Sequence, residues 1–186
     1  MSVVDFIISR RSNGKVGEPA PPPHVVRRAI DAAVAAPDHG RLRPWEFILI
    51  EGAARAKLGD IMADALRARD PQTPEPVLAK ARSNPLRAPL LIVVAAKIHV
   101  DHPKIPEIEQ VLAAGAAAEN LMLALHAEGY GCMWRTGAPS YDPAVRAALG
   151  LRPSDQIVGF VYVGTPIGVP AETPRPDAAA FIREWR

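Results

Sequence analysis

The strongest constraint on the fold is a helix pattern over residues 107–128 that has almost no polar face. Its centre consists of valine, leucine, alanine and glycine, and Gly129 follows as a natural left-handed helix cap. A helix with so few polar positions must be covered on most sides, and its small side chains let another helix approach closely. We therefore expect it to be the central helix of the domain, a contact between two subunits, or both.

Apolar segments typical of strands alternate with helix patterns along the rest of the chain. Strands are predicted over residues 45–50, 90–96, 130–134 and 157–163, and further helices within 3–8, over 23–36, within 58–66 and over 143–149. No internal repeat, linker or change of composition divides the 186 residues. The sequence therefore predicts a single domain, residues 1–186, of the α/β (α+β) class in three layers.

Composition excludes several classes of protein. The single cysteine, Cys132, rules out an intramolecular disulfide and favours a reducing compartment. The first ten residues do not resemble a secretory signal, and no uninterrupted apolar run is long enough to span a bilayer. The net charge is only +2, from 22 basic and 20 acidic residues. We expect a cytoplasmic protein with neither a membrane nor a nucleic acid as partner.

The first candidate for chemistry is Arg10-Arg11-Ser12, which directly follows the short helix near the N-terminus. Arginine presents a planar fork of donors that suits phosphate, and a serine hydroxyl adds a further donor. The alternative is a solvated basic helix end that interacts favourably with the helix dipole. The sequence contains no Walker-type glycine loop and no GxGxxG, so it supports neither a P-loop nor a Rossmann dinucleotide site.

The second candidate is the polar loop over residues 37–44, just before a predicted strand. His39, Arg41 and Arg43 could face an anion or the edge of an electron-rich heterocycle. The alternative is a surface loop whose positive charge is balanced by Asp38. His99 and His102 could be two metal ligands, but no third ligand is evident, so no metal site is predicted.

The third candidate is the segment over residues 131–137, where a predicted strand ends in a glycine-containing loop. Ligands commonly bind at such strand ends, and backbone amides there could bind the carbonyl groups of a ring. Cys132 lies in the strand beside a tryptophan, so we interpret it as an inert buried thiol rather than a nucleophile.

Taken in this order, these segments resemble the nitroreductase family over nearly the whole chain. The residues that carry the resemblance are Ile8-Ser9-Arg10-Arg11-Ser12, Ala36-Pro37-Asp38-His39, Pro44-Trp45, Arg87-Ala88-Pro89-Leu90, Trp134-Arg135-Thr136-Gly137, Ile157-Val158-Gly159-Phe160 and Gly164-Thr165-Pro166.

The resemblance implies a three-layer fold with a central mixed sheet flanked by helices, and a homodimer of the domain-swapped type with two FMN sites at its interface. It also implies hydride transfer with ping-pong kinetics from NADH or NADPH to a small electron-poor acceptor such as a nitroaromatic or a quinone. A flavin carries the redox chemistry itself, so no nucleophile is required of the protein. The alternative is a flavin-binding carrier or sensor without turnover.

The resemblance further implies which residues hold the cofactor. Arg10-Arg11-Ser12, called the arginine–serine motif below, would bind the phosphate and the ribityl chain. His39 of that same subunit would reach the flavin, and backbone groups of the other subunit would contact its ring. Whether Gly14, Lys15, Arg41 or Arg43 contacts the flavin ring is left open. The expected cofactor-binding residues are Arg10, Arg11, Ser12, His39, Trp134, Arg135 and Thr136.

Overall fold

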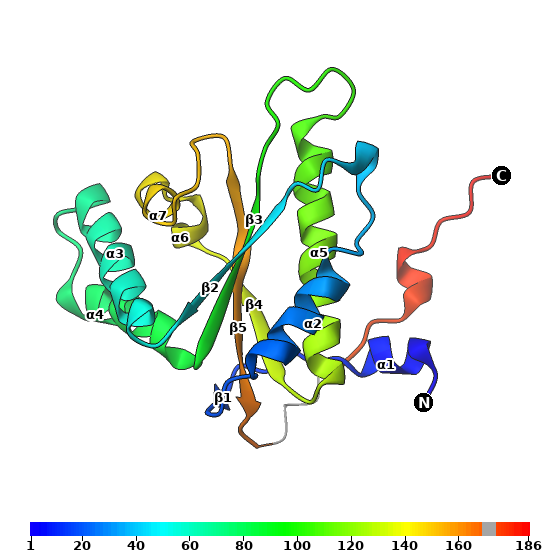
Figure 1. The fold of residues 1–186 in the computed structure, drawn as a ribbon, viewed down its shortest axis with the longest axis horizontal. Helices are drawn as coiled ribbons and strands as arrows, with labels where there is room; N and C mark the ends of the chain where they lie inside the picture. The colour runs from blue at the N-terminus through cyan, green and yellow to red at the C-terminus, as the bar shows by residue number, and fades with distance from the viewer. Residues whose placement is uncertain (169–173) are drawn as a thin grey trace.

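A computed structural model describes residues 1–168 and 174–186 (Figure 1). A five-stranded sheet forms the middle layer, with α2 and α5 on one face and α3, α4 and α7 on the other. The strands are β1 (Val16–Gly17), β2 (Trp45–Glu51), β3 (Leu90–Ala96), β4 (Gly131–Arg135) and β5 (Gln156–Pro166).

Seven α-helices and three short 3₁₀ turns accompany the sheet within the described residues. The 3₁₀ turns are His39–Arg41, Asn84–Arg87 and Ala178–Phe181. The helices are α1 (Val3–Ser9), α2 (Pro23–Ala33), α3 (Ala53–Arg69), α4 (Glu75–Ser83), α5 (Glu107–Ala127), α6 (Ala138–Tyr141) and α7 (Pro143–Ala148).

Strand β3 is buried along its whole length and contributes to both cores of the domain. Because successive side chains of a strand point to opposite faces, Leu91 and Val93 pack with α3, α4 and α7. Ile92 and Val94 pack with α2 and α5 instead. The predicted three-layer α/β (α+β) arrangement is therefore confirmed.

The strand directions differ from the expected mixed sheet. Val161 of β5 lies opposite Ile92 of β3 and Trp134 of β4, so β5 runs between these two strands. Every ladder between described strands is antiparallel, and the expectation of a mixed sheet is wrong. The reason lies in the connection between β2 and β3, which consists of two helices, α3 and α4. A pair of helices returns the chain to the sheet edge that it left, whereas one helix would give a parallel crossover.

Several predicted boundaries also change. Helix α2 ends at Ala33 rather than near residue 36, because tight backbone bonds from Ala35 and Ala36 to Ala32 and Ala33 close a turn. Helices α4 and α6 were not predicted from the sequence. The predicted strands and the long helix at 107–128 are confirmed within two to three residues. The tail was expected to be extended from Ile167, and residues 169–173 of it lie outside the described part.

Helix α5 is the one described helix that is long and apolar enough, by length and composition, to cross a membrane. In this structure it lies across the sheet and along α2, with Ala117, Leu121 and Leu125 buried among strand residues. The Asn120 side chain also donates a hydrogen bond of 3.3 Å to the Ala32 carbonyl in α2. The apolar composition of α5 is therefore that of a core helix.

The close approach of α3 and α4 predicts opposite effects for the same substitution in two helices. A Cβ at Gly59 of α3 would overlap the backbone carbonyl of Arg82 in α4, whereas nothing lies within 4 Å of one at Gly115 of α5. We expect Gly59→Ala to lower the free energy of unfolding by about 1–3 kcal/mol. Gly115→Ala should raise it by about 0.5–1 kcal/mol, because glycine weakens a helix interior.

Urea denaturation of both variants measures these free energies. A Gly59→Ala variant as stable as Gly115→Ala would contradict the α3–α4 contact.

Candidate functional site

The segment that follows α1 runs along the beginning of β4. The backbone N–H of Asn13 donates a hydrogen bond of 2.8 Å to the carbonyl of Cys132. Asn13 is buried, and a Cβ placed at Gly131 would be 3.0 Å from its Nδ2 atom. The arginine–serine motif and β4, the strand that carries Trp134, are therefore neighbours within a single chain.

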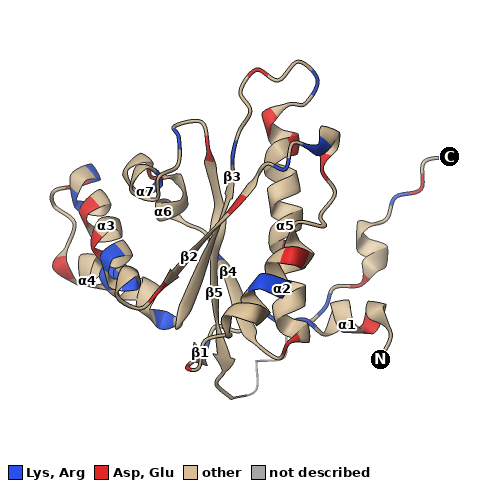
Figure 2. Cartoon of the chain, viewed as in Figure 1, with Lys and Arg blue, Asp and Glu red and all other residues tan. Residues whose placement is uncertain are grey.

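Two guanidinium groups meet at the end of α1. Arg11 Nη1 donates hydrogen bonds of 2.7 Å to the Ile8 carbonyl and 3.0 Å to the Arg10 carbonyl. Arg175 Nη2, from the tail, donates to the same two carbonyls at 3.2 and 2.5 Å. Figure 2 shows the basic beginning of the tail beside the basic segment after α1. Neither guanidinium forms an ion pair with any described carboxylate.

Arg10 is in a different situation from these two cations. Its Nε atom lies 3.2 Å from Glu119 Oε1 on α5, and its side chain is largely buried. The ion pair attaches the segment after α1 to the middle of α5. Ser12, in contrast, is exposed, and its hydroxyl makes no hydrogen bond to any part of the chain that the structure describes. The donors available to a ligand are therefore Ser12 and the remaining guanidinium nitrogens of Arg11 and Arg175, which make no hydrogen bond to the described residues.

A cavity of about 440 Å³ lies beside this cluster, lined in part by Ser9, Arg11, Asn13 and His126. The Ser9 hydroxyl is 3.2 Å from His126 Nε2, and the imidazole stacks on Phe6 at a ring distance of 5.1 Å. Burial, together with the positive charges of the neighbouring arginines, lowers the pKa of His126. The imidazole is therefore neutral near pH 7 and leaves the positive charge to the guanidinium groups.

The side chains at the end of β4 are already engaged in packing. Trp134 Nε1 donates a hydrogen bond of 3.2 Å to the Val158 carbonyl, and its ring lies over Gly159, where a Cβ would overlap it. The Arg135 guanidinium lies over the Tyr162 ring, 5.9 Å from the centroid. Thr136 is exposed. What this strand end can offer a ligand is therefore mainly its backbone at residues 136–137.

His39 lies far from the arginine–serine motif of its own chain. Its Nδ1 atom is 2.6 Å from Glu109 Oε2, at the beginning of α5, whereas Ser9 contacts His126 at the other end of the helix. At 1.5 Å per residue, these two positions are about 25 Å apart along the helix axis. Within one chain, residues 10–13 therefore adjoin β4, whereas His39 does not.

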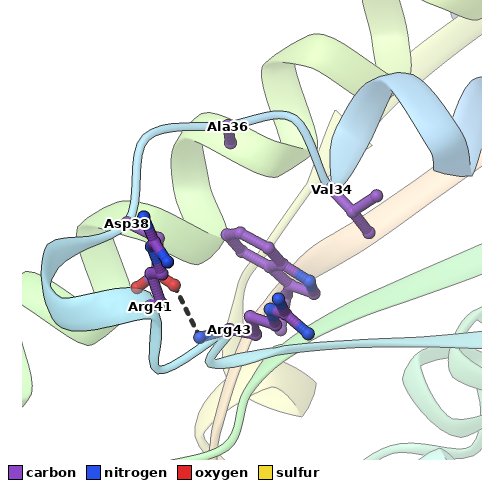
Figure 3. Close-up of a pocket in the computed structure, with 6 residues that line it drawn as sticks. Val34, Ala36, Asp38, Arg41 and Arg43 are labelled. Carbon is purple, nitrogen blue, oxygen red and sulfur yellow. Dashed lines mark hydrogen bonds between the residues drawn. The ribbon is translucent and has the colours of Figure 1, made fainter.

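The loop that carries His39 borders a second cavity, of about 560 Å³ (Figure 3). Asp38 Oδ2 accepts a hydrogen bond of 2.6 Å from the backbone N–H of Arg43. Arg41 and Arg43 have φ angles of 56° and 51°, in the left-handed region. The lining residues are Val34, Ala36, Asp38, Arg41, Arg43 and Trp45.

Arg175 is the residue of the candidate site that sequence reasoning missed. It follows the N-terminal motif by more than 160 residues, and its Pro-Arg-Pro surroundings carry no signal of a ligand. Only the path of the tail past α1 brings it to Arg11. Among the described residues, no group of three or more His, Cys, Asp or Glu side chains is arranged to hold a metal ion.

The chain is similar to known proteins over nearly its whole length. The sequence model of the nitroreductase family matches residues 7–165. A protein of Escherichia coli K12 named "Putative NAD(P)H nitroreductase YdjA" is 39% identical over 181 residues, which cover 94% of this chain and 97% of that protein. A Haemophilus influenzae protein named "Putative NAD(P)H nitroreductase" is 37% identical over 165 residues, 89% of each protein.

Solved structures share the fold over the whole chain. A nitroreductase-like family protein from Bacillus cereus has a TM-score of 0.83 and 25% identity, covering 100% of this chain and 96% of that one. A nitroreductase with bound FMN from Bacteroides fragilis has a TM-score of 0.75 and 21% identity, with full coverage of both chains. The chain belongs to the nitroreductase family. It is accordingly an oxidoreductase.

The environment of Cys132 predicts a thiol with little reactivity in the folded protein. Burial raises the pKa of this thiol to about 11, and its Sγ atom faces the Met122 carbonyl at 3.9 Å. Relative to an ordinary pKa of 9.0, a thiol with a pKa of about 11 has about 100-fold less thiolate at pH 8. Alkylation by iodoacetamide at pH 8 should therefore be at least about 100-fold slower in the folded protein than in guanidinium chloride. Comparable rates in the two states would contradict this environment.

Proposed function

We propose that the chain is an FMN-dependent oxidoreductase that transfers hydride from NADH or NADPH to a small electron-poor acceptor, such as a nitroaromatic or a quinone. The observation that carries the proposal is that Arg11 and Arg175 donate to the same two carbonyls and that neither has a carboxylate partner among the described residues. It is supported by family membership and by the FMN bound to the Bacteroides fragilis nitroreductase.

A phosphate group fits this cluster on physical grounds. Two like charges that share the same carbonyl acceptors repel each other unless an anion lies between or beside them. The terminal phosphate of FMN would supply that anion and accept charge-assisted hydrogen bonds from Arg11, Arg175 and the Ser12 hydroxyl. Arg10 stays in the predicted cofactor set as well, although its ion pair with Glu119 makes it the least available of the three arginines.

The flavin ring would lie toward the end of β4. Trp134 and Arg135 hold this strand end through packing, so we assign the ring contacts to the backbone at residues 136–137, together with Thr136. When bound, FMN supplies hydride transfer in two half-reactions, first with the nicotinamide and then with the acceptor, which is ping-pong kinetics. The chain itself binds and orients the ring and excludes water from one of its faces.

We further propose that the protein is a homodimer of the domain-swapped type. Apolar side chains are exposed on α1, at the beginning of α5 and in the tail, and such grouped exposure marks interaction surfaces. Strand β2 also pairs only with β3 among the described strands, so its other edge can accept a strand from a partner's tail. The exposed residues are Val3, Val4, Ile7, Ile8, Ile108, Leu112, Phe181, Ile182 and Trp185.

In such a dimer, the flavin site would combine two chains. Asn13, which follows Arg10–Ser12, bonds to Cys132 of β4 in the same subunit. Glu109, which contacts His39, lies ten residues of α5, or about 15 Å, from Glu119, which pairs with Arg10. We therefore propose that His39 reaches the flavin from the partner. A two-fold axis creates two identical sites of this kind.

Removal of the two free cations should release the cofactor. We expect Arg11→Ala/Arg175→Ala to weaken FMN binding at least tenfold, because hydrogen bonds to a charged group are each worth about 1.5–3 kcal/mol. FMN per chain is measured from the flavin absorption bands and from the chromophore released by heat. Lys57→Ala/Lys80→Ala is the matched control, since it removes two exposed positive charges from α3 and α4.

A folded Arg11→Ala/Arg175→Ala protein with one FMN per chain would show that the phosphate binds elsewhere. A wild-type protein that binds FMN but does not oxidise NADH or NADPH with a quinone or a nitroarene would instead be a flavin carrier or sensor.

Mixed dimers test the contribution of the two subunits. In a dimer of one His39→Ala chain and one Arg11→Ala/Arg175→Ala chain, the proposed arrangement leaves one site intact and places all substitutions in the other. We expect about half of the wild-type FMN content and NADH oxidation, above both parent homodimers. The dimers are obtained by co-expression with two different affinity tags. A mixed dimer no better than either homodimer would show that His39 serves its own chain.

A further inference from the structure

The cavity on the His39 loop is lined by two cations that are not part of the proposed FMN phosphate cluster. Neither the Arg41 nor the Arg43 guanidinium has a hydrogen bond or an ion pair in residues 1–168 and 174–186. The carboxylate of Asp38, which also lines the cavity, accepts the backbone N–H of Arg43 (Figure 3). Two guanidinium groups and one carboxylate therefore line this cavity of about 560 Å³, so the net charge of its lining is positive.

The backbone of the two arginines is unfavourable for their residue type. Both have φ angles above 50°, a region that residues other than glycine, asparagine and aspartate rarely adopt. Gly40, with φ 68°, is the residue suited to this conformation in the same loop. Local strain of this kind persists where the surrounding structure and a function hold it in place. The loop therefore directs the two cationic side chains to the cavity at a cost in stability.

The lining defines the chemistry of the ligand. A pair of guanidinium groups matches the oxygens of a phosphate dianion. Trp45 adds a partly exposed aromatic ring, on which a planar base can stack. Val34 and Ala36 complete an apolar wall. A nucleoside phosphate offers both a phosphate for the guanidinium groups and a planar base for the tryptophan ring.

The geometry points to Arg41 and Arg43 as the site for the 2′-phosphate of NADPH, and we infer that the enzyme prefers NADPH to NADH. The inference rests on the proposed function. The two arginines follow His39 by two and four residues, which is at most about 7 and 14 Å of extended chain. If His39 reaches the flavin of the partner, the cavity is adjacent to that flavin, where a dinucleotide donor must bind. The additional phosphate is the one group that distinguishes the two donors.

Steady-state kinetics of the FMN-loaded enzyme test the preference. The ratio of kcat/KM for NADPH to that for NADH should exceed ten in the wild type and fall at least tenfold in Arg41→Gln/Arg43→Gln. High salt should lower the ratio as well, because it screens exposed charges. Lys57→Gln/Lys80→Gln removes the same charge from the far face of the sheet and should leave the ratio unchanged.

A binding measurement separates this inference from the proposed function. Adenosine 2′,5′-bisphosphate is titrated calorimetrically into the protein, with no turnover required. Binding by the wild type that Arg41→Gln/Arg43→Gln weakens at least tenfold supports the cation site, even if the protein proves to have no NADPH oxidation. Equal affinity in the two proteins, no binding by the wild type, or a wild-type ratio that favours NADH would each overturn the inference.

Discussion

The packing of α5 across the sheet is the contact on which the rest of the structure depends. On its inner face, Ala117, Ala118, Leu121 and Leu125 are fully buried in one core with β3 and β5, and the small alanines bring the helix backbone close to the strands. The helix is also the frame for both candidate sites. Arg10 is attached to its middle through Glu119, Ser9 to its C-terminal end through His126, and His39 to its N-terminal end through Glu109.

Helix α5 also sets the distance between the two groups of candidate site residues in one chain. In one chain, α5 separates Glu119, which pairs with Arg10, from Glu109, which contacts His39, by ten residues, or about 15 Å. In the proposed dimer, a second copy would cover the apolar side chains left exposed on α1, at the beginning of α5 and in the tail. The proposed site between two subunits would bring together residues that α5 holds apart in one chain.

Carboxylate partners are distributed unevenly among the arginines of the described residues. Most described arginines of α2, α3 and α4 have a carboxylate partner on the surface, as Arg82 has in Glu75 and Asp60. Arg11, Arg41 and Arg43, which line the two cavities, and Arg175, which shares carbonyl acceptors with Arg11, have none among the described residues. Unpaired cations beside a concave surface attract anions, and both phosphate-bearing molecules of the proposed reaction are anions.

The sequence by itself determined the local features of this protein. The apolar pattern of α5, the four main strands and the inert position of Cys132 followed from spacing and composition, because these depend on neighbouring residues. The motifs at residues 10–12 and 134–136 were also visible, and their roles as cofactor contacts stay predictions. Only the tertiary structure decided the antiparallel order of the strands, the meeting of Arg175 with Arg11 and the separation of His39 from Arg10. These relations join segments far apart in the chain, and packing of the helices on the sheet sets them, not local propensity.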